Sequence, residues 1–256
     1  MILAVDIGNT SIIVGCFDRD EIRFVETMST DVGKTDLEYL VKFLALSDIY
    51  GIDKSDFDGA IVASVVPTLN RVFVSAIKKY CGVDAKLVGP GVKTGLNIHM
   101  DNPSSIGADL IVGSVAGLEK YGAPLVIIDM GTATTISVID DKKSYVGGAI
   151  MPGASISLSS LVDRTAQLPD ISLEKPSKVI GKNTVECMKS GIIMGQAGSI
   201  DGILDRIWDE LGYETRVVAT GGMARSIIPN CKKDIIIDDT LTLDGLKIIY
   251  DKNKKD

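Results

Sequence analysis

Two tight turns with the same residue pattern constrain this sequence more than any other feature. Residues 6–10 (DIGNT) follow the apolar run 2–5, and residues 129–134 (DMGTAT) follow the apolar run 125–128, close to half of the 256-residue chain later. Each pattern predicts a buried strand that ends at an aspartate, a glycine two residues on, and then hydroxyl or amide side chains. A strand–turn element that occurs twice predicts two similar α/β halves.

The glycine in each turn favours phosphate binding. Gly8 and Gly131 lack a Cβ, so the backbone can turn sharply and approach a phosphate closely. Successive N–H groups in such a turn bind anions, and nearby hydroxyls add donors. A carboxylate would repel phosphate unless a cation lay between them, so we interpret Asp6 and Asp129 as metal-side residues. The alternative is that each turn is a plain hairpin turn without a ligand, which is harder to hold for two copies.

Composition argues against several other classes of protein. The net charge of −7 disfavours a broad basic face for nucleic acid. Four scattered cysteines without a Cys-x-x-Cys pair disfavour structural zinc and a disulfide framework. His99 is the single histidine, which rules out a polyhistidine metal centre and disfavours a serine–histidine–acid hydrolase. No apolar run is long enough to cross a membrane and no basic leader starts the chain, so we expect a cytoplasmic protein.

The order of predicted elements repeats along the chain. Strands are expected at 2–6, 11–17, 22–28 and 59–64 and helices at 35–47 and 68–80, and the second half repeats this with strands at 125–129, 134–140, 144–150 and 216–219 and a helix at 153–163. Leu37, Leu40, Val41 and Leu44 predict one apolar face for the first helix. Residues 104–120 are predicted to join the halves as a helix. The glycines of the helical stretch 183–211 suggest close packing or a break near residues 198–202.

This repeated unit resembles the actin-like ATPase and sugar-kinase superfamily, in which two ribonuclease-H-like domains with mixed sheets face a nucleotide cleft. Seven motifs occur in the order and spacing of the type III pantothenate kinases, and the resemblance covers essentially the whole chain. They are DIGNT (6–10), GAD (107–109), DMGTATT (129–135), GGAIMPG (147–153), TAQLP (165–169), GKNT (181–184) and LTLDGL (241–246). We therefore expect an α/β fold with duplicated actin-like domains at residues 1–117 and 118–256.

The resemblance implies ATP-dependent phosphorylation of pantothenate to 4′-phosphopantothenate, the first step of coenzyme A biosynthesis. It implies Asp109 as the general base, Asp6 on the Mg²⁺ side and Asp129 as a ligand for a monovalent cation, K⁺ or NH₄⁺. The residues that would bind ATP and its phosphates are Asp6, Ile7, Gly8, Asn9, Thr10, Ser11, Gly131 and Thr132. Those that would bind the substrate are Gly107, Ala108, Asp109 and Thr184.

The family also forms homodimers with substrate sites near the subunit contact. The glycine-bearing helix around Gly191, Gly195 and Gly198 is a candidate for that close-packing face, although glycines also serve packing within one chain. Neither nucleic acid nor membrane is expected as a partner.

Two of the implied site residues have structural alternatives. Asp109 lies in an apolar helical segment, where it could instead be a buried structural group with a partner. Residues 183–186 (NTVE) also have the pattern of a helix N-cap with glutamate at the third helical position. Thr184 therefore belongs to a helix start whether or not it contacts substrate.

The sequence departs from the family pattern on the substrate side. Leu110 stands where the family usually has an arginine after Gly-Ala-Asp, and Met100 stands near a position that is often tyrosine. Leucine cannot supply the bidentate donors of an arginine. Alternative functions are therefore a nucleotide-binding paralogue with weak or no pantothenate kinase activity, or a kinase of another small hydroxylated substrate.

Overall fold

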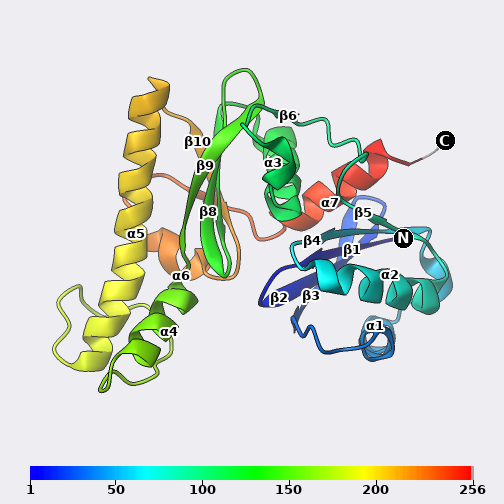
Figure 1. Ribbon diagram of the computed structural model, residues 1–256, viewed down its shortest axis with the longest axis horizontal. Helices are drawn as coiled ribbons and strands as arrows, with labels where there is room; N and C mark the ends of the chain where they lie inside the picture. Colours follow the sequence, from blue (N-terminus) through cyan, green and yellow to red (C-terminus); the bar gives the residue numbers. More distant parts are fainter. Residues whose placement is uncertain (255–256) are drawn as a thin grey trace. The chain divides into compact units, whose positions relative to one another are not determined.

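The computed structural model describes residues 1–254, so the last two residues of the predicted second domain lie outside the described part. The chain forms two compact units (Figure 1). The first contains Met1–Leu96, Asp101–Ala116 and the segment from Leu241 onward, and the second contains Asn97–Met100 and Gly117–Thr240. The segment from Leu241 onward follows the predicted boundary after residue 117, yet it packs with the N-terminal segment.

The first unit is built on a mixed five-stranded sheet with the order β3-β2-β1-β4-β5. The strands are β1 (Ile2–Ile7), β2 (Ser11–Asp18), β3 (Glu21–Ser29), β4 (Gly59–Ser64) and β5 (Ala85–Leu87). β1 runs antiparallel to β2 and parallel to β4. The carboxyl ends of β1 and β4 therefore lie at the same edge of the sheet, where ligands bind in open α/β folds.

Alternation along β1 sends its side chains to opposite faces of this sheet. The odd-numbered residues, such as Val5, pack with α1 (Asp36–Tyr50) and α2 (Pro67–Cys81), which lie side by side (Figure 1). Ile2 and Ala4 pack with α3 (Ala108–Tyr121) and α7 (Leu241–Lys252). Asp6 belongs to this even-numbered set, and its cross-strand partner Ile13 packs against the same core. The Asp6 side chain is therefore on the α3–α7 side of the sheet.

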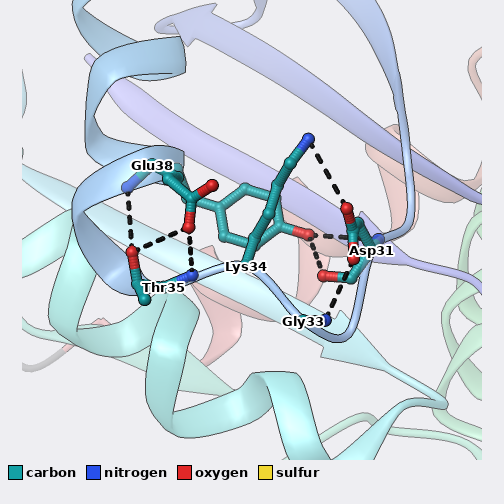
Figure 2. A network of polar contacts seen from close by, with 6 residues as sticks. Asp31, Gly33, Lys34, Thr35 and Glu38 are labelled. Carbon is teal, nitrogen blue, oxygen red and sulfur yellow. Dashed lines mark hydrogen bonds and ion pairs between the residues drawn. The ribbon is translucent and has the colours of Figure 1, made fainter.

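The first helix forms as predicted, but of its predicted apolar face only Leu40 packs against the core. Thr35 caps α1: its N–H donates to Glu38 Oε2 (2.8 Å), and the Glu38 N–H donates to Thr35 Oγ1 (3.4 Å) (Figure 2). Leu37 and Val41 are 60% and 57% exposed. The buried face instead carries Tyr39 and Phe43, which pack on a phenylalanine of α2. Because α1 has apolar residues on both faces, spacing alone could not select the buried one.

The second unit repeats the arrangement on a mixed six-stranded sheet with the order β11-β10-β7-β8-β9-β6. β7 runs antiparallel to β8 and parallel to β10, just as β1 runs to β2 and β4. The predicted duplication is thus confirmed. The strands are β6 (Asn97–Ile98), β7 (Leu125–Met130), β8 (Ala133–Ile139), β9 (Ser144–Pro152), β10 (Arg216–Thr220) and β11 (Ile236–Ile237), and the helices are α4 (Ala154–Arg164), α5 (Thr184–Leu211) and α6 (Ala224–Ile227).

The helices correct two further predictions. The predicted helix 104–120 begins only at Ala108, after a short 3-10 turn, η2 (Pro103–Ser105), and Gly107. Two other 3-10 turns are η1 (Lys54–Asp56) and η3 (Ile228–Asn230). The stretch 183–211 forms one unbroken helix, α5, so the suggested break near residues 198–202 is absent. Among residues 1–254, no helix combines the length and apolar character that crossing a membrane requires.

Candidate active site

Hydrogen bonds within the first unit hold the backbone of the turn after β1. The Gly8 N–H donates to the Ser11 carbonyl (3.0 Å), and a Cβ on Gly8 would lie only 2.9 Å from that oxygen. Thr30, which directly follows β3, holds the turn by donating through Oγ1 to the Gly8 carbonyl (2.7 Å) and through its N–H to the Thr10 carbonyl (2.9 Å). Asn9, Thr10 and Ser11 are exposed. The Gly8 N–H is already used, so a phosphate would meet the other groups of the turn.

The turn after β7 is closed in a related way in the second unit. The Gly131 N–H donates to the Ala133 carbonyl (3.1 Å), and the Gly153 N–H donates to the Thr132 carbonyl (3.2 Å). Gly153 is the N-cap of α4, and a Cβ there would lie 2.4 Å from the Thr132 oxygen. The turn is thus supported by a glycine that sequence reasoning did not single out as a site residue. Gly131 is exposed and Thr132 is half-buried.

A second unpredicted support lies beside Asp129. Gly221 has a φ of +94°, and a Cβ there would lie 2.6 Å from the Met130 N and 2.7 Å from Asp129 Oδ1. The Met223 N–H donates to the Met130 carbonyl (3.3 Å). The turn after β10 therefore packs directly against the end of β7. The sequence shows two successive glycines after residue 220, but not which backbone Gly221 approaches.

Asp109 lies in the first turn of α3, on the same side of the first sheet as Asp6. Its Oδ1 accepts a hydrogen bond from the Leu110 N–H (2.9 Å). Burial raises the pKa of Asp109, and hydrogen bonds from backbone N–H groups oppose this only in part. A half-buried carboxylate with a raised pKa is a better proton acceptor than an exposed one, which suits a general base.

Gly107 and Val65 connect Asp109 to the carboxyl ends of the parallel strands. A Cβ on Gly107 would lie 2.3 Å from Asp109 Oδ1 and 3.6 Å from Val65 Cγ1. Val65 directly follows β4, and its N–H donates to the Ile7 carbonyl at the end of β1 (3.0 Å). Asp6, the Gly8 turn and Asp109 thus belong to one region of the first unit. Asp129, Thr132 and Thr184 belong to the second unit.

Thr184 is the first residue of α5 and lines a groove of about 550 Å³ between α4 and α5. Asn183 is the predicted N-cap, and its Oδ1 accepts a hydrogen bond from the Glu186 N–H (2.9 Å). Gln196 lies at the wall of the groove, with its Nε2 donating to the Pro152 carbonyl (2.9 Å). The other lining residues are Ser157, Leu161, Leu168, Cys187, Met188, Gly191, Ile192 and Gly195.

The described residues contain no cluster of three or more histidine, cysteine, aspartate or glutamate side chains suited to hold a metal. This does not conflict with Mg²⁺, which proteins commonly bind through one or two carboxylates, waters and the phosphates of the substrate. Asp6 and Asp129, each at the start of a glycine turn, fit that mode of binding.

Solved structures of low sequence identity share this fold. A putative Baf family transcriptional activator from Campylobacter jejuni superposes with a TM-score of 0.59 at 18% identity, covering 98% of each chain. Component A of (R)-2-hydroxyglutaryl-CoA dehydratase from Acidaminococcus fermentans superposes with a TM-score of 0.57 at 12% identity, covering 97% of this chain and 96% of the other. At such identities the likeness concerns the fold alone. This fold, with its two related α/β units, is that of the actin-like ATPases.

Sequence comparison then narrows the class to one family. Residues 2–206 match the family model of type III pantothenate kinase. A type III pantothenate kinase from Geobacillus sp. (strain WCH70) is 45% identical over 253 residues, which cover 99% of this chain and 98% of that protein. The chain belongs to the type III pantothenate kinase family, which uses ATP.

Proposed function

We propose that this chain transfers the γ-phosphoryl group of ATP to the primary hydroxyl of pantothenate, with Asp109 as the general base. The product is 4′-phosphopantothenate, the first intermediate of coenzyme A biosynthesis. The observation that carries this assignment is Asp109 itself: a half-buried carboxylate with a raised pKa, near the carboxyl ends of β1 and β4, in a chain with a full-length family match. Phosphoryl transfer needs a group that accepts the hydroxyl proton, positioning and neutralisation of charge.

The two glycine turns supply the phosphate contacts in this proposal. Ile7, Gly8, Asn9, Thr10 and Ser11 form the turn after β1, where the exposed hydroxyls and the amide can donate to phosphate oxygens. Gly131 and Thr132 contribute from the turn after β7. The fixed backbone of each turn supports the assignment, because a preorganised donor loses little entropy on binding.

Asp6 and Asp129 are the proposed cation residues. Asp6 lies on the Mg²⁺ side of the phosphates, and Asp129 is a ligand for K⁺ or NH₄⁺. Bound cations would neutralise phosphate charge next to these carboxylates. Because Gly221 has no Cβ, the turn after β10 leaves room for the Asp129 carboxylate.

Gly107 and Ala108 are the proposed pantothenate contacts beside Asp109 in the first unit, and Thr184 is a further proposed contact from the second unit. Gly107 gives access because a side chain there would occupy the space of the Asp109 carboxylate. Thr184 is exposed and lines the α4–α5 groove, so a ligand in the groove could contact it.

The central test is a coupled ATP-consumption assay with pantothenate, Mg²⁺ and K⁺, in which mass spectrometry identifies the product. Asp109→Asn should lower kcat by about 10²-fold or more, since general-base catalysis contributes that much. Absence of phosphopantothenate from the unsubstituted chain would overturn the proposal, and undiminished turnover by the variant would remove Asp109 from its role.

Leu110 favours one second candidate, a kinase of another small hydroxylated compound. Its side chain carries no donor for a carboxylate of the substrate. A panel of small hydroxylated acids, alcohols and sugars decides between the two, together with Leu110→Arg. Pantothenate as clearly the best substrate would remove the second candidate, and a higher kcat/KM of Leu110→Arg for pantothenate would identify position 110 as a substrate contact.

We also propose a homodimer in which the exposed face of α5 is the contact surface. A Cβ on Gly191, Gly195 or Gly198 would meet no other atom within 4 Å, so packing within the chain does not require these glycines. Each glycine costs about 1 kcal/mol relative to alanine in a helix interior. Close approach of a second backbone would offset that cost.

Light scattering combined with gel filtration tests the homodimer. Gly195→Leu should shift the chain from dimer to monomer, whereas Gly212→Asn, at the left-handed end of α5, should leave the dimer intact. A monomer in the unsubstituted chain, or an unchanged dimer in Gly195→Leu, would contradict the proposed surface.

A further inference from the structure

A second groove lies in the first unit, between α2 and the edge of its sheet. Its volume is about 530 Å³. One wall is the α2 face that carries Asn70, Arg71, Val74, Ser75, Lys78 and Lys79, and the other is formed by Asp84 and Leu87 at β5. None of these residues belongs to the proposed catalytic machinery.

The strand at this groove has one side without a strand neighbour. β5 is the last strand in the order of its sheet, next to β4 alone. The Val88 N–H, just beyond β5, points inward and donates to the Val62 carbonyl of β4 (2.8 Å). Because the backbone groups of successive residues in a strand point to opposite sides, those of Ala85 and Leu87 point outward. Leu87 is also an exposed apolar side chain.

The groove is cationic on a chain whose net charge is −7. The Arg71 guanidinium forms no hydrogen bond or ion pair with residues 1–254. Lys78 pairs with Asp84 (2.8 Å) and Lys79 with Asp36 (2.7 Å), and both lysine side chains are about half exposed. Exposed ion pairs contribute little free energy, so these lysines can turn to another carboxylate at small cost.

We propose that this groove binds an extended acidic peptide segment of a partner protein, which adds to the sheet beside β5. The outward N–H and C=O groups of Ala85 and Leu87 match the alternating acceptors and donors of an extended backbone. Arg71 and Lys78 match acidic side chains of the segment, and Val74 with Leu87 matches an apolar one. The short length of β5 limits unspecific pairing, since long open edges promote aggregation.

Fluorescence anisotropy tests binding with two labelled peptides, an alternating glutamate–valine octapeptide and its lysine–valine counterpart. The unsubstituted chain should bind the acidic peptide, more weakly at high salt, and should bind the basic one far less. Arg71→Glu should weaken binding by about tenfold or more, because it replaces a charge-assisted contact by repulsion. Lys54→Glu, at an exposed lysine of η1, reverses the same charge elsewhere and should have no effect.

Leu87→Pro tests the strand addition itself. It removes an N–H that points outward, so the pairing of β5 with β4 is kept while the peptide loses a donor. Hydrogen exchange gives a readout that does not depend on this variant folding: bound acidic peptide should slow exchange at the Ala85 and Leu87 amides. All three variants should keep the pantothenate-dependent ATP consumption of the unsubstituted chain, which separates this proposal from the kinase assignment.

Three outcomes would overturn the proposal. The first is no binding of the acidic peptide, or equal binding of the basic one. The second is unchanged binding in Arg71→Glu. The third is binding without slower exchange at Ala85 and Leu87, which would mean that the groove attracts anions through its side chains and adds no strand.

Discussion

Gly107 leaves open the space that the carboxylate of Asp109 occupies: a Cβ on Gly107 would lie 2.3 Å from Asp109 Oδ1. Gly107→Ala should therefore displace the carboxylate and lower kcat by about 10²-fold, because misplacement of a catalytic group by about 1 Å has effects of that size. Stability should change little, since the contacted atom is the end of a side chain that can rotate away.

Gly113→Ala is the matched control for this variant. Gly113 lies in the interior of the same helix, and a Cβ there would meet no other atom within 4 Å. The control should keep full activity and gain up to about 1 kcal/mol of stability from helix propensity. Equal kcat values for the two alanine variants would show that Gly107 does not position Asp109.

Asp109→Asn should make the chain more stable at neutral pH while it removes activity. Burial raises the pKa of Asp109, so the folded state binds the proton more tightly than the unfolded chain does. Stability is consequently lost as the pH rises from the ordinary carboxyl pKa through the higher folded pKa. Asparagine cannot ionise and avoids this loss. Urea unfolding at neutral pH should show the gain, and unfolding below the ordinary pKa should show none.

The contribution of Asp238 to stability should depend on pH in the opposite sense to that of Asp109. It is 8% exposed and accepts hydrogen bonds from Lys120 Nζ (2.6 Å) and the Tyr121 hydroxyl (2.8 Å). Burial acts to raise the pKa of Asp238, but these hydrogen bonds outweigh it and the pKa is lowered. Its stabilisation is therefore present above the ordinary carboxyl pKa and is lost as the pH falls through the folded pKa.

Asp238→Ala should cost about 2 kcal/mol at neutral pH, a value reduced for the partial exposure of Lys120. Urea unfolding at neutral and acidic pH measures this cost. A cost that stays the same at acidic pH would contradict an electrostatic origin.

Gly221→Ala should lower the stability of the protein, whereas Gly222→Ala should not. Alanine at position 221 meets both a left-handed φ of +94° and the Met130 backbone at 2.6 Å, so a loss of about 1–3 kcal/mol is expected. A Cβ on Gly222 would meet nothing within 4 Å. Thermal unfolding measures the stabilities, and the K⁺ dependence of kinase activity should change in Gly221→Ala alone. Equal stability of both variants would contradict the contact with β7.

Local patterns in the sequence were sufficient to predict the repeated strands and the two glycine turns. Apolar runs such as 2–5 and 125–128 form central strands because they are buried on both faces. The prediction of the buried face of α1 was wrong because Tyr39 and Leu37 lie on opposite sides of the helix and either side could have faced the core. The Tyr39 side is buried because Tyr39 packs against Phe73 of α2. That contact joins residues far apart in the sequence.

The glycines that support the candidate site could not be predicted from local patterns, because they also act through contacts between residues far apart in the sequence. Gly153 approaches Thr132, and Gly221 approaches Asp129. The residues of the second pair are 92 positions apart in the sequence. A single sequence shows that these residues are glycines but not which other backbone they approach. The metal-side role of Asp6 came from its turn pattern and the role of Asp109 from the family resemblance. Their shared side of the sheet follows from strand alternation and packing.

Helix α7 has a consequence for how this protein is made in the cell. Leu243, Leu246 and Ile249 complete the same core as Ile2 and Ala4, which are synthesised well before them. During synthesis one apolar face of the first sheet therefore stays uncovered by α7 until Leu241–Lys252 have emerged from the ribosome. Vectorial folding would let the second unit mature earlier, so protection of the nascent N-terminal sheet by a chaperone is expected to matter for yield.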